Sequence, residues 1–174
     1  MKIPSQYFQF NDRPTLILVT ATQDAVLYWV ENGKIEKNME IVSDQKEDRD
    51  KPGVFRAKRP NMVHHGVAFE DKQQKVREKA VKDFLLKLNK DIKEKEDLVE
   101  KAESIFIFTS DFMEREVLDI LPEKIKEKID KVFTGNYTKE HQLELIKKIN
   151  SFFDEKKVVP TDEEANKILK RGKK

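Results

Sequence analysis

The chain contains no cysteine, and this absence removes several classes of function at once. Disulfide frameworks, thiol nucleophiles and zinc sites built on thiolates all require that residue. Glycine is also scarce, with 5 residues in 174. The sequence has no G-x-G-x-x-G, P-loop or G-x-S-x-G pattern. We therefore expect no phosphate-binding loop, no serine-hydrolase nucleophile and no cofactor.

Long apolar runs and a strong net charge are missing as well. No run approaches the ~18 apolar residues of a membrane span, and the first residues do not form a signal-peptide pattern. We therefore expect a cytoplasmic protein without membrane contact. The 35 basic and 33 acidic residues give a net charge of +2. Any surface that binds a polyanion must therefore be local.

Apolar and β-branched runs near the start predict a three-stranded antiparallel meander. Residues 15–20 (TLILVT) form a continuous apolar run, which is typical of a buried strand. Residues 25–31 (AVLYWVE) predict a second strand, and Asn32-Gly33 predicts a tight hairpin after it. The third strand is expected over residues 34–42, where the alternation of apolar residues is imperfect.

Helical periodicity alternates with further strands in the rest of the chain. One long helix is predicted over residues 69–97, because apolar residues recur there every four positions, and we interpret its lysine- and glutamate-rich face as solvated surface. A buried strand is predicted over residues 104–109 and a short strand over residues 131–135. The remaining helices are expected after Asp111, which forms a capping-box pattern with Glu114, over residues 122–129, from Thr138, and from Thr161.

The order βββ–loop–α–β–α–β–α predicts the fold class. A meander followed by alternating helices and strands implies a mixed sheet with helices on its faces. These lengths fit an RNase H-like, three-layer α/β domain. We expect a lead-in over residues 1–13, the α/β domain over 14–153, and an extension over 154–174 with a short helix and a basic tail. Tyr7, Phe8 and Phe10 of the lead-in are candidates to pack on the domain.

Neither carboxylates nor histidines form a recognisable catalytic or metal-binding pattern. Nucleases of this architecture hold two metal ions with carboxylates at the sheet centre, yet residues 15–20 contain none. Asp24 is expected in a turn and Glu31 at a strand end. The adjacent His64 and His65 would point in opposite directions on an extended segment. We therefore assign no catalytic residue and no metal site.

The segment from Asp44 to Gly66 is the most informative stretch for function. It is longer than the ~12–15 residues of an ordinary structureless loop. Between Lys51 and Asn61 it contains four basic residues and no acid. Such a composition favours contact with RNA phosphates, with Phe55 available to stack on a base. The predicted RNA-binding set is Lys51, Phe55, Arg56, Lys58, Arg59, His64 and His65, extended by Lys72, Lys75 and Arg77 at the helix start.

Four segments carry a resemblance to a known family. They read LILVTATQDAVLYWVENGKIEK, FEDKQQKVREKAVKDFLLKL, SIFIFTSDFMEREVL and LPEKIKEKIDKVFTGNYTKEHQLELIKKI. Over about residues 14–153 the chain resembles the central domain of archaeal and eukaryotic class-I peptide release factors and of Pelota. Bacterial proteins also carry this domain, some of them labelled host-attachment proteins. The strand-to-helix junction T-S-D-F is the most specific element.

The resemblance implies a translation-related domain but not the family's hydrolytic activity. In the release factors, the loop before the long helix carries a Gly-Gly-Gln motif that promotes peptidyl-tRNA hydrolysis. This chain has a lone Gly53 there, and Gln45 is not preceded by glycines. Pelota also lacks the motif. The resemblance therefore implies a stand-alone domain that binds the ribosome or tRNA without catalysis.

Two alternatives remain open from the sequence. One is a protein-interaction module on the same fold with no RNA affinity, acting through the third-strand edge or through the helix carrying Phe152 and Phe153, with a protein partner or a second copy of the chain. The other is a hydrolase that uses His64 and His65.

Overall fold

The computed structural model describes residues 1–42 and 67–158. Within these ranges, side chains are not described for residues 67–74, 76, 77, 157 and 158. The basic segment 51–65 and the helix predicted from Thr161 therefore lie outside the described residues.

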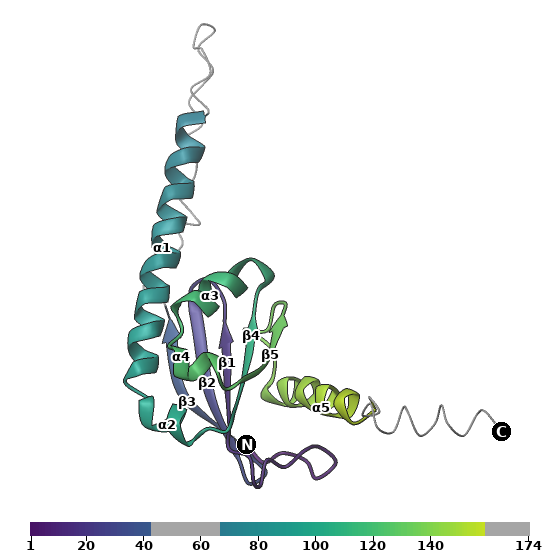
Figure 1. The fold of residues 1–174 in the computed structure, drawn as a ribbon. Helices are drawn as coiled ribbons and strands as arrows, with labels where there is room; N and C mark the ends of the chain where they lie inside the picture. The colour runs from purple at the N-terminus through teal and green to yellow at the C-terminus, as the bar shows by residue number, and fades with distance from the viewer. Residues whose placement is uncertain (43–66, 159–174) are drawn as a thin grey trace, which may run out of the picture.

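A mixed five-stranded sheet in the order β3-β2-β1-β4-β5 forms the centre of the molecule (Figure 1). β2 pairs antiparallel with both β1 and β3, whereas β4 and β5 run parallel to β1. This arrangement confirms the predicted RNase H-like α/β fold class. The strands are β1 (Thr15–Thr20), β2 (Asp24–Glu31), β3 (Lys34–Val42), β4 (Ser104–Thr109) and β5 (Ile129–Thr134).

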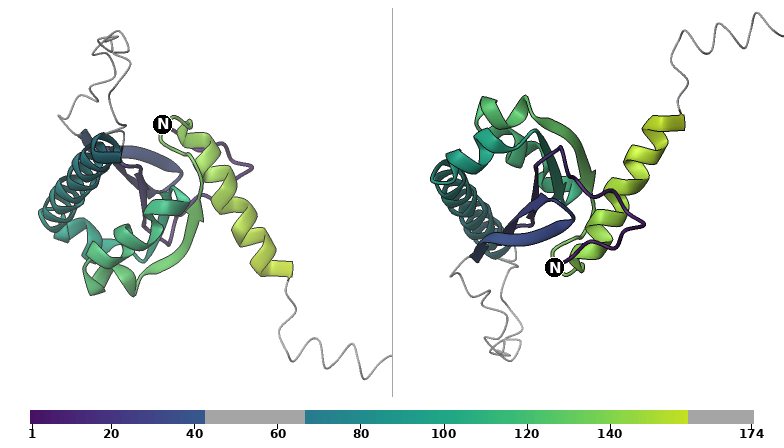
Figure 2. Two further views of the ribbon diagram at one scale, coloured as in Figure 1. Left: turned by 90° about the horizontal axis from the view of Figure 1, so that it is seen from above. Right: turned by 90° about the horizontal axis from the view of Figure 1, so that it is seen from below.

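Helices cover both faces of the sheet and give the fold its three layers (Figure 2). One face carries α1 (Val67–Lys93), α2 (Glu96–Lys101), the 3-10 turn η1 (Asp111–Met113), α3 (Glu114–Ile120) and α4 (Glu123–Lys126). The other face carries α5 (Gln142–Val158) together with the first residues of the chain.

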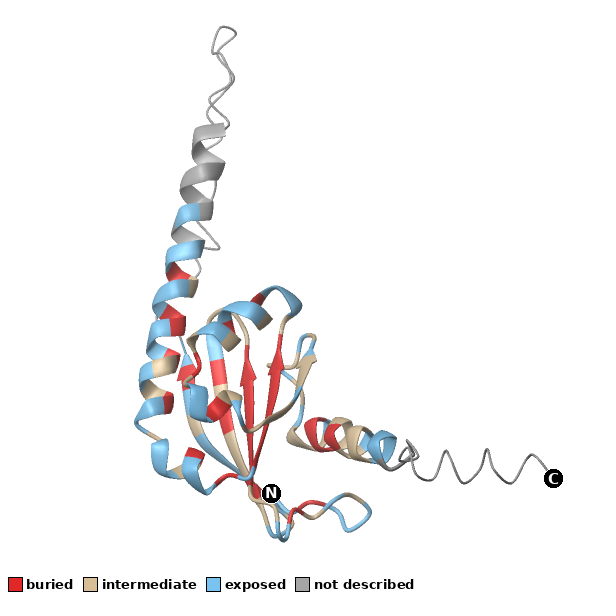
Figure 3. Cartoon of the chain, viewed as in Figure 1, coloured by how far each residue is buried: buried red, intermediate tan, exposed pale blue. Residues whose placement is uncertain are grey.

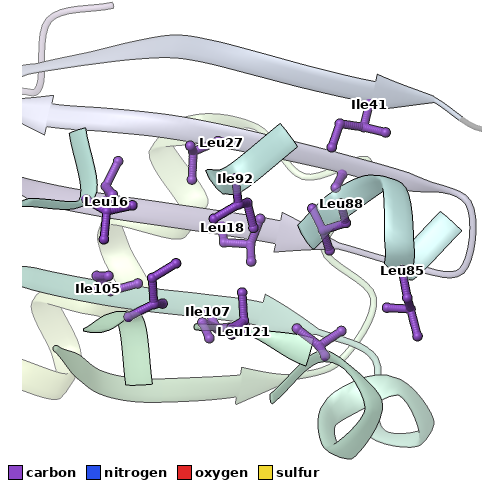
Figure 4. Packing of buried hydrophobic residues seen from close by; sticks show 14 of the residues in the cluster. Leu16, Leu18, Leu27, Ile41, Leu85, Leu88, Ile92, Ile105, Ile107 and Leu121 are labelled. Atoms are coloured by element: carbon purple, nitrogen blue, oxygen red, sulfur yellow. The ribbon is translucent and has the colours of Figure 1, made fainter. Parts of the chain in front are cut away.

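The first hydrophobic cluster lies between the sheet and the α1 side (Figure 4). Leu16 and Leu18 of β1 alternate with Ile17 and Val19, which point to the opposite face. β1 is buried on both sides, and this is why its sequence is a continuous apolar run rather than an alternating one.

The second cluster is rich in aromatic rings. Phe106 and Phe108 of β4 are fully buried in it and contact Phe133 of β5. Phe152 and Phe153 of α5 lie edge-on to Phe106, with centroids at 5.9 and 5.8 Å. Edge-to-face packing of this kind stabilises a core beyond the burial of its area.

A β-bulge explains the imperfect alternation of β3. Leu27 pairs with Met39 and Tyr28 pairs with Lys37, so Asn38 has no partner on β2. One extra residue turns the following side chains to the other face of the sheet. Ile35 therefore packs in the second cluster, whereas Met39 and Ile41 pack in the first.

The prediction of one helix over residues 69–97 is wrong at its end. α1 ends at Lys93, and a separate helix, α2, follows from Glu96. No glycine or proline marks this break. Ser104 pairs with Thr15 at the start of β1. The chain therefore changes direction after Lys93, so that β4 can begin beside β1.

The predicted capping box at Asp111 is also wrong. Asp111 is exposed and opens the 3-10 turn η1, and Ser110 at the N-cap position makes no side-chain capping bond. The turn closes instead through the backbone, where the Met113 amide donates to the Ser110 carbonyl at 2.9 Å. Burial of the Met113 side chain fixes this geometry.

Three further element bounds differ from the prediction. α5 begins at Gln142 rather than Thr138, because Tyr137 packs on Phe108 and its hydroxyl donates to the Thr134 carbonyl. These contacts hold the chain at the strand end before the helix begins. β5 begins at Ile129 rather than Lys131, and α4 covers only Glu123–Lys126 of the predicted 122–129.

The first residues of the chain wrap around the β2–β3 turn. Asn32 and Gly33 have positive φ values of 49° and 69°, as a tight hairpin requires. The Gly33 amide donates to the Gln9 carbonyl at 2.6 Å, and the Ile3 amide donates to the Gly33 carbonyl at 2.7 Å. Phe10 is 1% exposed in the second cluster, so the lead-in contributes to the core.

Two phenylalanines in this segment offer a matched test of that contribution. We expect Phe10→Ala to lower the free energy of unfolding by ~3–5 kcal/mol, because it removes a fully buried ring. Phe8 is 38% exposed, and Phe8→Ala should lower it by less, ~1–2 kcal/mol, through the loss of its ring contacts with Phe10 and Phe153. Urea denaturation of both variants measures the difference. Equal, small losses would show that the lead-in does not belong to the folded unit.

Candidate nucleic-acid interface

The structure places three of the ten predicted RNA-binding residues. Lys72, Lys75 and Arg77 lie in the first half of α1, and the Lys75 side chain is exposed. The side chains of Lys72 and Arg77 are not among those described. The remaining seven predicted residues fall in segment 43–66, outside the described residues, and their role stays a prediction.

The second half of α1 is fixed to the sheet by a buried stripe. Phe84, Leu88 and Ile92 are at most 3% exposed and belong to the first cluster. Their four-residue spacing keeps them on one side of the helix. Figure 3 shows this buried side facing the sheet and exposed residues on the opposite side.

The first half of α1 extends beyond the sheet (Figure 1). Ala80 is the first residue of α1 that is buried among those described. A helix rises ~1.5 Å per residue, so the 13 residues before it add about 20 Å. The helix thus begins at a position well removed from the compact part of the domain.

A contact between β3 and α1 involves Val42, the described residue that precedes segment 43–66. The Lys87 ammonium donates to the Val42 carbonyl at 3.4 Å, where β3 ends. Val67 lies 20 residues before Lys87 in α1, which corresponds to about 30 Å along the helix. The two described residues that flank segment 43–66, Val42 and Val67, are therefore far apart.

The solvent side of α1 carries a regular series of lysines that we call the outer lysine row. Its members are exposed and recur every three or four residues, so they lie along one side of the helix. Among the described side chains, the row consists of Lys75, Lys79, Lys82, Lys90 and Lys93, with Leu86 at the intervening position. The lysine- and glutamate-rich pattern predicted an ordinary solvated surface here, and Lys75 was the one member of the row among the predicted RNA contacts. The spacing of the other lysines was the signal that would have identified them.

The carboxylates considered for metal binding do not converge. Asp24 and Glu31 lie at opposite ends of β2, which separates them by about 23 Å at ~3.3 Å per residue. The Glu31 carboxylate accepts a hydrogen bond from the Trp29 indole at 3.1 Å. Within residues 1–42 and 67–158, no group of three His, Asp or Glu side chains could hold a metal ion.

His141, the one histidine that the structure describes, has a structural role. It is exposed and immediately precedes α5, and its Nδ1 accepts a hydrogen bond from the Leu143 amide at 3.3 Å. This contact satisfies one of the free amides at the helix start. His64 and His65 lie outside the described residues.

Charged residues of α2 and α4 face each other near the end of α1. The Lys124 ammonium donates to Glu96 at 2.6 Å and to Glu100 at 3.2 Å. These contacts raise the pKa of Lys124, and Lys124 lowers the pKa of Glu96 below its ordinary value. The contribution of the Glu96 carboxylate to the stability of the fold is therefore fully present above the ordinary carboxyl pKa. It is lost as the pH falls through the lowered pKa of Glu96. It is small, because both groups are solvated.

The surfaces considered for a protein partner are occupied or protected. Phe153 contacts Phe8 and Phe10 as well as Phe106, and Phe152 is half-buried beside it. The outward side of β3 is largely charged and interrupted by the bulge at Asn38. Charged residues and bulges are features that discourage strand pairing at a sheet edge.

Comparisons with known proteins give partial similarities to solved structures. No protein-family profile matches the chain, and no curated protein matches its sequence. A solved structure described as an archaeal protein has a TM-score of 0.49 and 12% identity, covering 94% of this chain and 47% of its own. An archaeal translation termination factor has a TM-score of 0.47 and 11% identity, covering 82% and 40%. The chain spans less than half the length of either structure. No helix in the described part of the chain is long and apolar enough to span a membrane.

A pair of leucines on α1 tests how the helix is anchored. Leu88 is fully buried and Leu86 is 67% exposed. We expect Leu88→Ala to lower the free energy of unfolding by ~2–5 kcal/mol through lost burial and a residual cavity. Leu86→Ala should change it by less than about 0.5 kcal/mol. Urea denaturation measures both, and a small loss for Leu88→Ala would contradict the observed packing of α1.

Proposed function

We propose that this chain is a release-factor-like domain that binds ribosomal RNA or tRNA through its basic segment 51–65. We further propose that it does so without hydrolysing peptidyl-tRNA. The sequence resemblance over about residues 14–153 supports the first part of this proposal. The missing Gly-Gly-Gln motif supports the second, because the residues that perform the family's chemistry are absent.

The observation that carries the proposal is the position of α1 relative to the sheet. The helix begins directly after the basic segment, about 20 Å beyond Ala80, its first buried residue among the described side chains. The sheet and its helices thus hold the start of α1, which follows the charged segment, at a distance from the core. Functional residues often belong to segments that a rigid scaffold positions in this way. Four basic side chains in residues 51–61 supply the charge needed to contact phosphates.

Co-sedimentation of the full chain with ribosomes tests this function. We expect the protein to pellet with ribosomes at ~50 mM salt and much less at ~200 mM, because phosphate contacts release counterions. The variant Arg56→Glu, Lys58→Glu, Arg59→Glu should remain in the supernatant at both concentrations, since it reverses three charges of the segment.

A matched control separates a local effect from a change in net charge. Lys34, Lys131 and Lys139 are exposed residues of β3, of β5 and of the loop after β5. Their replacement by glutamate changes the net charge by the same amount as the segment variant, and this control should still pellet. Ribosome binding that survives reversal of the segment charges would contradict the segment as the binding site. A wild-type protein that never pellets would contradict the proposed function.

A further inference from the structure

The outer lysine row presents its charge to solvent almost without compensation. Lys90 is paired with Glu94 at 4.0 Å, and both side chains are more than 60% exposed. No other ion pair among the described residues involves a member of the row. An exposed pair of this kind contributes at most about 1 kcal/mol and is easily exchanged.

Acidic residues of α1 lie beside the row rather than in it. A helix turns ~100° per residue, so Glu78 and Asp83 lie roughly a sixth to a fifth of a turn from its axis, and Glu94 follows the end of the helix. The row itself runs from Lys75 to Lys93, a length of about 27 Å at ~1.5 Å per residue. It therefore forms a basic strip along one side of a helix, interrupted only at Leu86.

We propose that the outer lysine row binds the sugar-phosphate backbone of double-helical RNA. The proposal deepens the proposed function, on which it rests for the choice of RNA, but it assigns different residues. Lysine is a compact point charge that contacts phosphates and does not read base edges in a fixed geometry. The row has no aromatic or arginine side chain on which unpaired bases would stack. Its chemistry therefore fits a duplex backbone better than a single strand.

The apolar content of α1 argues against a membrane surface as the ligand. A helix that lies on a membrane inserts a broad apolar face into the lipid. The apolar side of α1 is already covered by the sheet, with Phe84, Leu88 and Ile92 buried there. Leu86 is the one large apolar residue of α1 that is exposed among the described side chains. The row thus carries positive charge but has no free apolar face that could insert into lipid.

Leu86 interrupts the row and provides a gain-of-function test. Its side chain is 67% exposed, so a lysine at this position fills the gap without disturbing the core. We expect Leu86→Lys to tighten binding of an RNA duplex. The slope of log affinity against log salt should become steeper by about one unit. Leu86→Gln is the matched control, since it adds a polar side chain without charge, and should leave the slope unchanged.

The loss-of-function test removes four charges of the row from the full chain. The row variant carries Lys75→Gln, Lys79→Gln, Lys82→Gln and Lys93→Gln. The control replaces the exposed Lys34, Lys101, Lys131 and Lys139 by glutamine, so that the net charge is the same. Fluorescence anisotropy measures binding to a labelled RNA duplex, to oligouridine of equal length, and to vesicles containing phosphatidylserine. Glutamine is chosen because it preserves helix propensity.

We expect the row variant to bind the duplex at least ~10-fold more weakly at about 0.1 M salt. The slope of its log affinity against log salt should be smaller by about three to four units. The control should stay within about twofold of the wild type, and oligouridine should bind more weakly than the duplex. Equal effects of the two variants would overturn the proposal. Binding to vesicles but not to duplex RNA would overturn it as well.

The segment variant, with Arg56, Lys58 and Arg59 replaced by glutamate, separates this proposal from the proposed function. Loss of duplex binding in the row variant alone supports the row and contradicts the segment as the RNA site. Loss in the segment variant alone contradicts the row and leaves the proposed function standing. Loss in both supports both, and a wild-type chain that binds no RNA overturns both.

Discussion

The packing of the second half of α1 against the sheet is the constraint on which the rest of the structure depends. Phe84, Leu88 and Ile92 fix the position and rotation of a 27-residue helix. Because these residues lie on one side, the lysines on the opposite side face solvent. The first half of the helix extends past the sheet and begins next to the basic segment. The location of both proposed RNA contacts follows from this single interface.

The opposite side of the sheet shows how the remaining apolar residues are used. Phe106 and Phe108 alternate with Ile105 and Ile107, so β4 contributes to both clusters, as β1 does. The bulge at Asn38 lets the edge strand β3 contribute to both as well. α5 and the first ten residues close the second cluster through contacts among phenylalanine rings. The two faces thus have different roles, because one positions α1 and the other closes the core.

Local patterns predicted most of the fold. Residues 15–20 and 104–109 are strands as expected, and Asn32-Gly33 forms the expected hairpin, because burial and turn geometry act over a few residues. The break after Lys93 and the 3-10 turn at Asp111 were not predicted, since long-range pairing and packing set them. The bulge depends on how two strands align, and the sequence shows it only as a broken alternation.

The candidate site was predictable to a smaller extent. Charge and length identified segment 44–66, but they do not define its structure. Lys75 was identified because it lies near that segment, whereas Lys79, Lys82, Lys90 and Lys93 were included in a general solvated face. The periodicity of these lysines is visible in the sequence. What the sequence does not show is that α1 extends beyond the sheet and that the row lacks strong ion pairs.

The most direct test of this account is a cysteine scan of α1, which the absence of native cysteine makes possible. Each exposed position from Lys75 to Lys93 would carry one cysteine with a photoactivatable crosslinker, in the presence of duplex RNA or ribosomes. The account predicts crosslinks that peak at the positions of the outer lysine row, with a period of three to four residues. Crosslinks that show no such period, or that peak on the side of Glu78, would contradict it.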